Sequence, residues 1–244
     1  QNLVNAFVAI EDKRFFEHQG VDWKRTFAAF ANYFLHFYSS NQGGSTITQQ
    51  LVKNLTGDTS QRPSRKIREI MRARYLETHY VKETIIECYL NTIAMGHGTY
   101  GVEVAANYYF GKSVKDLTLS ECACLAAITK SPKYYAPDDY PEANQKRRVT
   151  VLYEMYDQGY ITKDEYEKAK AEEVKIVASK DALKETDNNS YFVDALIDQV
   201  VNALMDKFGY EKTHANQIFY SSGYKIYATV DANIQKTMES VFSD

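Results

Sequence analysis

The chain has 244 residues, of which 44% are hydrophobic and 25% are charged, and its formal net charge is −3. This is the composition of a globular protein with enough chain for one large domain, alone or with a smaller piece. The net charge argues against a nucleic-acid-binding surface over the whole molecule, and a content of only 4 prolines and 11 glycines argues against a turn-rich β fold.

Taken in order, the chain is expected to be mainly helical. Apolar residues recur at three- and four-residue steps, and Thr118 with Glu121 and Thr162 with Glu165 form capping boxes at two helix starts. The expected helices are 5–17, 21–38, one that starts near Thr46, 65–75, 81–91, 100–111, 119–129, 141–157, 163–173 and 191–208, with loops at 56–64 and 133–137.

The polar stretch 174–190 predicts a domain boundary, with a first domain at 1–175 and a tail at 176–244. In the tail, alternating residues predict a strand at 224–230, and Asp231 is expected to cap a last short helix. Because a lone strand needs partners, the tail is interpreted as the start of a further domain. The sequence begins without Met and has neither a signal peptide nor an apolar run of membrane-spanning length, so we expect a fragment.

The segment 11–20 holds three carboxylates, one imidazole and two aromatic rings, directly after the apolar run 7–10. Glu11 ends that run, and partial desolvation there would raise its pKa toward the range of a general base. Asp12 and His18 are expected to shape the loop and to hold Glu11. The simpler alternative is a solvated turn.

An aromatic stripe covers the expected helix 21–38, where Trp23, Phe27 and Phe34 recur at helical spacing. Such a stripe is typical of a core-facing helix, and it also suits a membrane interface. The sequence pattern leaves both interpretations open.

Glycines at 43 and 44 precede a helix start that could bind an anion. An ordinary capped helix explains the hydroxyl residues there, but not the density of large amides and a lysine. The candidate binding residues are Ser45, Thr46, Gln49, Gln50, Lys53 and Asn54.

The expected helix 65–75 is basic in a chain that is net acidic, which suits a multiply charged anion. Arg65 and Lys66 lie within helical reach of Glu69. The alternative is a solvated, salt-bridged face. The expected buried face consists of Ile67, Ile70, Met71 and Tyr75.

Four further residues are expected to carry no chemistry. Cys88, Cys122 and Cys124 fit neither a disulfide framework nor a zinc pattern, and small buried side chains are the simpler interpretation. His97 stands between two glycines without a second ligand at metal spacing, so no metal site is predicted there.

Five blocks in order, 11–20, 44–54, 65–69, 82–91 and 147–152, resemble the motifs of the peptidoglycan glycosyltransferase domain (glycosyltransferase family 51) of class A penicillin-binding proteins. The ordered set is far more specific than any one block. The resemblance implies a mainly α, lysozyme-like domain with a small membrane-associated lobe, followed by a short α+β linker to a transpeptidase region. No Ser-x-x-Lys motif of that region occurs in the chain.

The resemblance also implies a reaction. The 4-hydroxyl of the GlcNAc of lipid II attacks the anomeric carbon at the end of a growing glycan strand. The configuration at that carbon inverts, a β-1,4 bond forms, and undecaprenyl pyrophosphate leaves. Glu11 would take the proton, and Glu69 would be the second essential carboxylate. The resemblance implies the bilayer and other cell-wall synthesis proteins as partners, and it implies no nucleic acid. The implied location is the extracytoplasmic face of the cell membrane.

The residues implied to bind the substrate are Asp12, His18, Ser45, Thr46, Gln49, Gln50, Lys53, Asn54, Arg65 and Lys66. The pattern demands no cofactor, although Glu69 could orient a divalent cation such as Mg²⁺ or Mn²⁺. Two alternatives remain: a glycan-cleaving enzyme of lysozyme or lytic transglycosylase type, and a non-catalytic lipid-binding module. A hydrolase would gain little from the basic helix.

Overall fold

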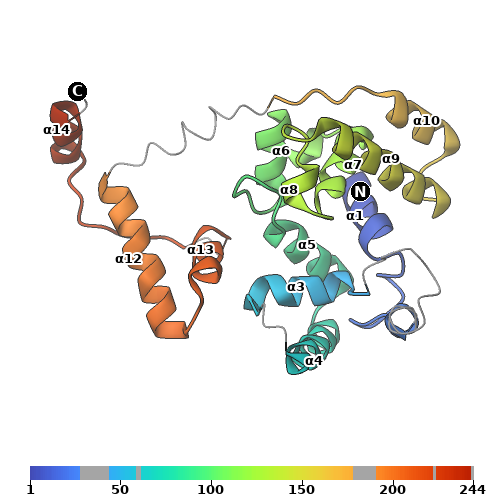
Figure 1. Cartoon of the computed structure of the whole chain (residues 1–244), viewed down its shortest axis with the longest axis horizontal. Helices are drawn as coiled ribbons and strands as arrows, with labels where there is room; N and C mark the ends of the chain where they lie inside the picture. Colours follow the sequence, from blue (N-terminus) through green and yellow to red (C-terminus); the bar gives the residue numbers. More distant parts are fainter. Residues whose placement is uncertain (28–43, 59–61, 178–190, 222–223, 243–244) are drawn as a thin grey trace. The chain divides into compact units, whose positions relative to one another are not determined.

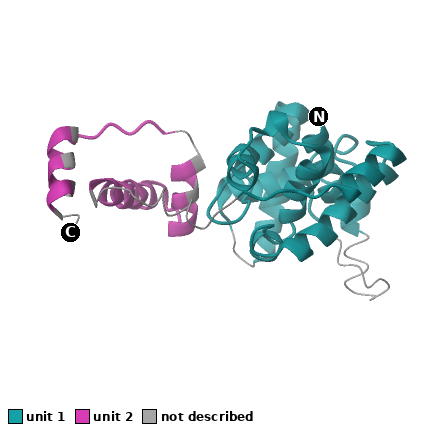
Figure 2. Ribbon diagram, turned by 90° about the horizontal axis from the view of Figure 1, so that it is seen from above, with its two compact units in different colours: residues 1–177 teal, residues 178–244 magenta. Residues whose placement is uncertain are grey.

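The computed structural model describes residues 1–27, 44–58, 62–177, 191–221 and 224–242 (Figure 1). The chain forms two compact units, Gln1–Val177 and Ala178–Asp244 (Figure 2). The described residues are mainly helical, which confirms the predicted fold class.

The first unit contains α1 (Asn2–Glu11), α3 (Ile47–Thr56), α4 (Pro63–His79), α5 (Lys82–Thr92), α6 (Val102–Phe110), the 3₁₀ turn η1 (Val114–Asp116), α7 (Leu119–Ile128), α8 (Pro132–Tyr135), α9 (Pro141–Asp157) and α10 (Lys163–Ala171). The second contains α12 (Tyr191–Phe208), α13 (Lys212–Ser221) and α14 (Ala232–Phe242). Among the described residues, no helix combines the length and the apolar character needed to cross a bilayer.

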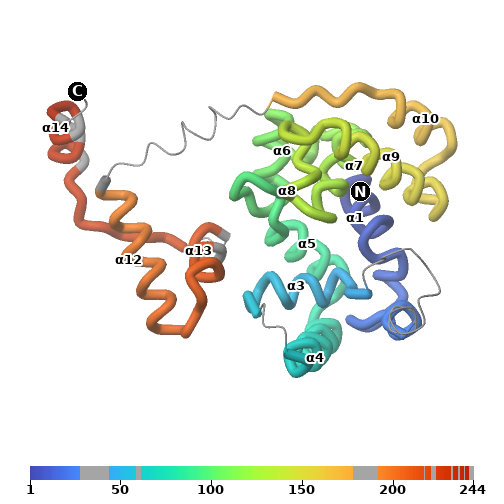
Figure 3. Tube along the Cα trace, viewed as in Figure 1, coloured from blue at the N-terminus to red at the C-terminus, as the bar shows by residue number. Residues whose placement is uncertain are grey.

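Helix α7 lies among α1, α6, α8 and α9 in the first unit (Figures 1 and 3). It packs against α1 and α9, and every residue from Ser120 to Ile128 is buried. Small side chains such as Ala123 and Ala127 let its neighbours approach closely. Its predicted capping box is present, because Thr118 accepts from the backbone N–H of Glu121 and the Glu121 carboxylate accepts from that of Thr118.

A second group consists of α3, α4 and α5, which contact one another. The chain after α1 passes tightly against this group at Gly20, whose φ is +81°. A Cβ on Gly20 would lie 2.7 Å from the carbonyl oxygen of Ala73 on α4. Glycine is therefore required for this close approach, and the loop after Glu11 is held against α4.

The structure corrects three predicted boundaries. The first helix ends at Glu11, and turns follow, because the buried carboxylate of Asp12 binds the start of α3. A short helix, α8, overlaps the expected loop 133–137, since Pro132 begins a helical turn at its first position. The helix expected at 21–38 begins at Trp23, and residues 28–38 lie outside the described part.

The predicted buried face of α4 is wrong for three of its four residues, and the fourth, Ile70, is half-buried. Ile67, Met71 and Tyr75 are 60%, 67% and 60% exposed, whereas Glu69 and Ala73 are buried. The opposite face turns inward because Arg65 and Lys66 neutralise the Glu69 carboxylate, and because Ala73 leaves room for Gly20. An exposed apolar stripe therefore lies along α4.

The tail also differs from expectation. Residues 224–230 form no strand, because none of the described residues provides a partner for them. The sequence pattern did not indicate α13, which packs on α12 through a small core of Val201, Leu204 and Ala215. Asp231 caps α14 as predicted, since its carboxylate accepts from the backbone N–H of Asn233.

The cysteines divide into two kinds. Cys122 and Cys124 are buried in α7, and burial raises the pKa of each thiol to about 12. Cys88 is exposed, which corrects the expectation that it is buried. We expect the native chain at pH 8 to react with a thiol reagent such as DTNB at one cysteine, and the denatured chain at three. Cys88→Ser should abolish the native reaction, and rapid native modification of either thiol in α7 would contradict this packing.

Candidate active site

Glu11, the last residue of α1, projects into a cleft where three elements meet. Its Oε1 accepts a hydrogen bond from the Thr129 hydroxyl at 2.6 Å, and its Oε2 accepts from Nε2 of Gln50 at 2.9 Å. Both carboxylate oxygens are thus held by neutral donors, one at the end of α7 and one on α3. The orientation of the carboxylate is fixed, and lone pairs on each oxygen remain for another proton.

The side chain of Gln50 is itself oriented by a tyrosine. The phenol of Tyr89 on α5 donates to Oε1 of Gln50 at 3.2 Å. Burial, reinforced by the charges of Glu11 and Asp12, holds the pKa of Tyr89 well above its usual value, so the phenol keeps its proton. The sequence pattern indicated neither Tyr89 nor Thr129 as a site residue, because they lie far along the chain from Glu11.

Asp12 and His18, both predicted to bind the substrate, do not line the cleft with Glu11. Asp12 is fully buried, and its Oδ2 accepts from the backbone N–H of Ile47 at 3.0 Å and lies 2.9 Å from Nε2 of His18. A carboxylate at the first N–H groups of α3 is favoured by the helix dipole. The pair therefore joins the loop after Glu11 to the start of the helix that carries Gln50.

Asp22 and two arginines form one rim of the cleft. Nε and the terminal nitrogen of Arg14 donate to the two Asp22 oxygens at 2.9 and 2.6 Å. Arg25 donates to the backbone carbonyl oxygen of Glu11 at 2.6 Å. Burial works to raise the pKa of Asp22, but the backbone N–H of Arg25 and the Arg14 guanidinium outweigh it and lower the pKa below 3.8.

The lowered pKa of Asp22 predicts that acid weakens its contribution to the stability of the fold. The ionised Asp22 stabilises the fold fully above its unfolded pKa near 3.8, and that contribution is lost as the pH falls through the lower folded value. We expect Asp22→Asn to lower the free energy of unfolding at pH 7 by about 1–3 kcal/mol. In urea titrations from pH 7 to pH 2.5, the difference should shrink below about pH 3.8; a constant difference would contradict the pairing.

The cleft has a volume of about 880 Å³ and a cationic lining. Its described lining has twice as many cationic as acidic side chains. The cations are Lys13, Arg14, Lys24, Arg25, Lys130 and Arg147, and the acids are Glu11, Asp22 and Glu154. Some of this charge is paired, because Lys13 bridges to Glu154 and Arg14 to Asp22. Lys130 and Arg147 remain on the side toward α9 and add positive potential beside Glu11.

The predicted binding residues of the α3 segment divide into two groups. Ser45 and Gln50 line the cleft. Thr46 and Gln49 are buried and form the capping box of α3, with Thr46 accepting from the Gln49 backbone N–H and also donating to the Gly20 carbonyl at 2.6 Å. The simpler interpretation, an N-capped helix, thus accounts for Thr46 and Gln49.

The predicted cluster of Arg65, Lys66 and Glu69 lies beside the cleft. Glu69 is buried, Arg65 donates to it at 2.6 Å, and Lys66 donates to its other oxygen. Lys66 also donates to the Ser45 hydroxyl at 2.9 Å, and Ser45 lines the cleft. The cluster therefore reaches the cleft through Lys66, while Glu69 itself lies in a separate shallow recess with Lys53 and Arg65.

The remaining predicted residues lie farther out. Lys53 is exposed and Asn54 is half-buried on α3, and neither lines the cleft with Glu11. In the fifth motif, Arg147 lines the cleft, whereas Arg148 is buried and donates to the backbone carbonyl of Glu172 at 3.1 Å. Within the described residues, three metal-ligand side chains converge at His97, Asp138 and Asp139, away from Glu69.

Comparisons with known proteins point to one family. The family model described as "Transglycosylase" matches residues 1–156. Penicillin-binding protein 1A of Clostridium perfringens (strain 13 / Type A) is 40% identical over 262 residues, covering 100% of this chain and 37% of that protein. Penicillin-binding protein 1F of Bacillus subtilis (strain 168) is 40% identical over 239 residues, covering 98% and 32%.

Among solved structures, penicillin-binding protein 1A from Haemophilus influenzae is similar at 29% identity and a TM-score of 0.40, covering 79% of this chain and 24% of that one. The chain spans about a third of the length of the Clostridium and Bacillus proteins.

Proposed function

The chain belongs to the transglycosylase family, and on that premise we propose that it is the peptidoglycan glycosyltransferase domain (residues 1–175) of a class A penicillin-binding protein, followed by a linker region (176–244). It polymerises lipid II into β-1,4-linked glycan strands during cell-wall synthesis and releases undecaprenyl pyrophosphate. The observation that carries the proposal is a doubly oriented carboxylate, Glu11, inside a cleft lined by cations.

Glu11 acts as the general base. A sugar hydroxyl is a weak nucleophile, so a positioned carboxylate has to remove its proton as it attacks. Thr129 and Gln50 each hold one carboxylate oxygen, so the remaining lone pairs point in fixed directions. Tyr89 fixes Gln50 in the orientation in which its amide N–H₂ faces Glu11 and its carbonyl faces the phenol.

The leaving group requires cations instead of an acid. A departing pyrophosphate carries its own negative charge, and that charge is best stabilised by preorganised donors at the position where it develops. Arg147 and Lys130 lie in the same cleft as Glu11, and Lys66 approaches it through Ser45. Glu69 orients Arg65 and Lys66 through these two ion pairs.

The exposed apolar side chains mark the side that meets the bilayer. Ile67, Met71 and Tyr75 form a stripe on α4, and Trp23 and Phe27 are 45% and 66% exposed after the Glu11 loop. Large exposed rings and aliphatic chains suit a membrane interface, where a lipid-linked substrate is collected. The proposed place is the extracytoplasmic face of the cell membrane, with lipid II, the growing strand and other cell-wall proteins as partners.

Arg147→Ala should reduce polymerisation. Removing a charged donor from the cleft should cost about 1.5–3 kcal/mol of transition-state stabilisation, which is roughly a 10- to 150-fold fall in kcat/KM. Arg68→Ala is the matched control, because Arg68 is exposed and pairs with Asp58 away from the cleft. The kcat/KM of each variant is measured from initial rates of lipid II consumption in detergent. Equal falls in kcat/KM in both variants would contradict a specific role for Arg147.

The function itself is tested by incubating the purified chain with purified lipid II in detergent and separating the products by size. We expect glycan polymers that lysozyme cleaves. In a parallel reaction with preformed glycan strands, cleavage of the strands together with unchanged lipid II would indicate a glycan-cleaving enzyme. Binding of lipid II with neither polymerisation nor strand cleavage would indicate a non-catalytic module.

A further inference from the structure

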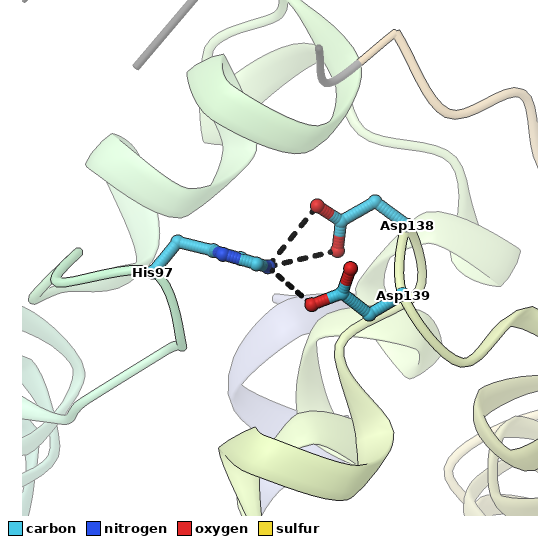
Figure 4. A group of neighbouring side chains, drawn as sticks. All are labelled: His97, Asp138 and Asp139. Carbon is cyan, nitrogen blue, oxygen red and sulfur yellow. Dashed lines mark hydrogen bonds and ion pairs between the residues drawn. The ribbon is translucent and has the colours of Figure 1, made fainter. Parts of the chain in front are cut away.

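Three side chains of metal-ligand type meet outside the catalytic cleft (Figure 4). His97 lies in the loop between α5 and α6, and Asp138 and Asp139 lie between α8 and α9. Nε2 of His97 is 3.1 Å from each oxygen of Asp138 and 3.5 Å from Oδ2 of Asp139. Both carboxylates, although adjacent in sequence, face the same ring nitrogen.

The spacing of these atoms matches a coordination sphere. Ligand atoms about 2.0–2.2 Å from a tetrahedral Zn²⁺ lie roughly 3.3–3.6 Å from one another. The nitrogen–oxygen distances here are 3.1 and 3.5 Å, and one ligand atom from each residue lies within 4.8 Å of the others. A cation would therefore fit between the three groups with little movement of the side chains.

The charge of the cluster points the same way. One ring nitrogen can offer a single N–H or a single lone pair, yet three carboxylate oxygens face it. Two neighbouring carboxylates repel each other unless positive charge lies between them. A cation placed between the two carboxylates would offset this repulsion.

The surroundings preorganise the three ligands. The Tyr108 phenol donates to Oδ2 of Asp138 at 3.2 Å, which is the kind of outer hydrogen bond that orients a ligating carboxylate. The backbone of the His97 loop is closed by a hydrogen bond from the Met95 N–H to the Thr99 carbonyl, by another from the Thr99 N–H to the Gly96 carbonyl, and by an isolated bridge from Ala94 to Tyr100. The His97 and Asp138 side chains are largely buried, at 17% and 9% exposure, while Asp139 at 30% leaves an entry from solvent.

We propose that His97, Asp138 and Asp139 bind one first-row divalent cation, with Zn²⁺ as the best fit to an imidazole and two carboxylates. Water would complete its coordination. The sequence pattern predicted no metal role for His97, because Asp138 follows 41 residues later and meets it only through the fold.

The ion would fix one wall of the substrate region. It joins the loop before α6 to the residues that lead into α9. The start of α9 lines a second cavity of about 660 Å³, which shares Lys130, Arg147 and Thr150 with the catalytic cleft. The cation is thus a structural tie that holds α9 in position, and it takes no part in the reaction at Glu11.

Cobalt provides the test, because Co²⁺ replaces Zn²⁺ and its visible absorption reports the coordination geometry. The 244-residue chain, with any affinity tag removed and with Cys88→Ser to eliminate the exposed thiol, is titrated with CoCl₂ alone. We expect one equivalent to bind, with visible bands that an equivalent of Zn²⁺ abolishes, and a rise in Tm when Zn²⁺ is added. His97→Ala and Asp138→Asn should each weaken binding at least ~10-fold.

His79→Ala is the matched control, because His79 is exposed on α4, where it stacks on Tyr75 and lies beside the Thr78 hydroxyl. It should bind Co²⁺ as the parent does. Circular dichroism confirms that each variant is folded. The proposal is overturned if the parent chain binds no cobalt, or if His97→Ala binds cobalt equally well. It is also overturned if His97→Ala lowers Tm while Zn²⁺ changes the Tm of neither protein. In that case the cluster would be an ion pair between His97 and the two carboxylates.

Discussion

Replacing Glu11 with Gln is expected to lower kcat for lipid II polymerisation by about 10²–10⁴-fold, the usual contribution of a general base. The substitution removes the proton acceptor and little else. The carbonyl of the introduced glutamine can accept from Gln50, and its amide can donate to the Thr129 hydroxyl, which accepts as readily as it donates. Binding of lipid II should therefore change by less than about threefold.

Glu17→Gln is the control for this prediction. Glu17 lies in the same motif and carries the same charge, but it is exposed and does not line the cleft with Glu11. Its kcat should remain within about twofold of the parent. If Glu11→Gln retained most of the polymerising rate, or lost affinity for lipid II as severely as turnover, Glu11 would not be the base.

Asp12→Ala should cause the largest loss of stability, about 3–5 kcal/mol. Asp12 has no exposed surface, and its carboxylate satisfies the first backbone N–H of α3 and lies 2.9 Å from His18. Truncation leaves that N–H and the imidazole buried without their partner. Because the same contact positions α3, Gln50 should be displaced from Glu11 and activity should fall with stability.

Thermal unfolding followed by circular dichroism measures this effect, with Asp157→Ala as the control. Asp157 is an exposed aspartate at the end of α9, where a surface substitution normally changes stability by less than about 0.5 kcal/mol. A change of similar size in both variants would show that Asp12 is not the link between the Glu11 loop and α3.

The sequence predicted best what is decided locally. The capping box at Thr118, the helix from Pro141 to Asp157 and the cluster of Glu69 with Arg65 and Lys66 all depend on residues within four positions of one another. Such signals do not need the rest of the fold. The mainly helical class followed from them.

The contacts that the sequence did not indicate depend on distant partners. Thr129 reaches Glu11 across 118 positions, and Tyr89 reaches Gln50 across 39, so no local pattern indicates either contact. The α4 error has a different origin. The hydrophobic pattern placed Ile67 and Met71 inside, but Glu69, paired with Arg65 and Lys66, is buried and the apolar stripe is left exposed.

In the proposed reaction, a glycosyl group moves from a pyrophosphate carrier to a sugar hydroxyl, with Glu11 as the base and the cationic cleft holding the leaving group. The most direct measurement is the product balance of purified lipid II with the 244-residue chain, combining anomeric proton NMR with quantification of the released carrier. We expect one undecaprenyl pyrophosphate to be released for each new bond, and every bond formed to have the β configuration. Retention of configuration, or carrier release that yields free reducing sugars instead of new glycosidic bonds, would contradict the proposed reaction.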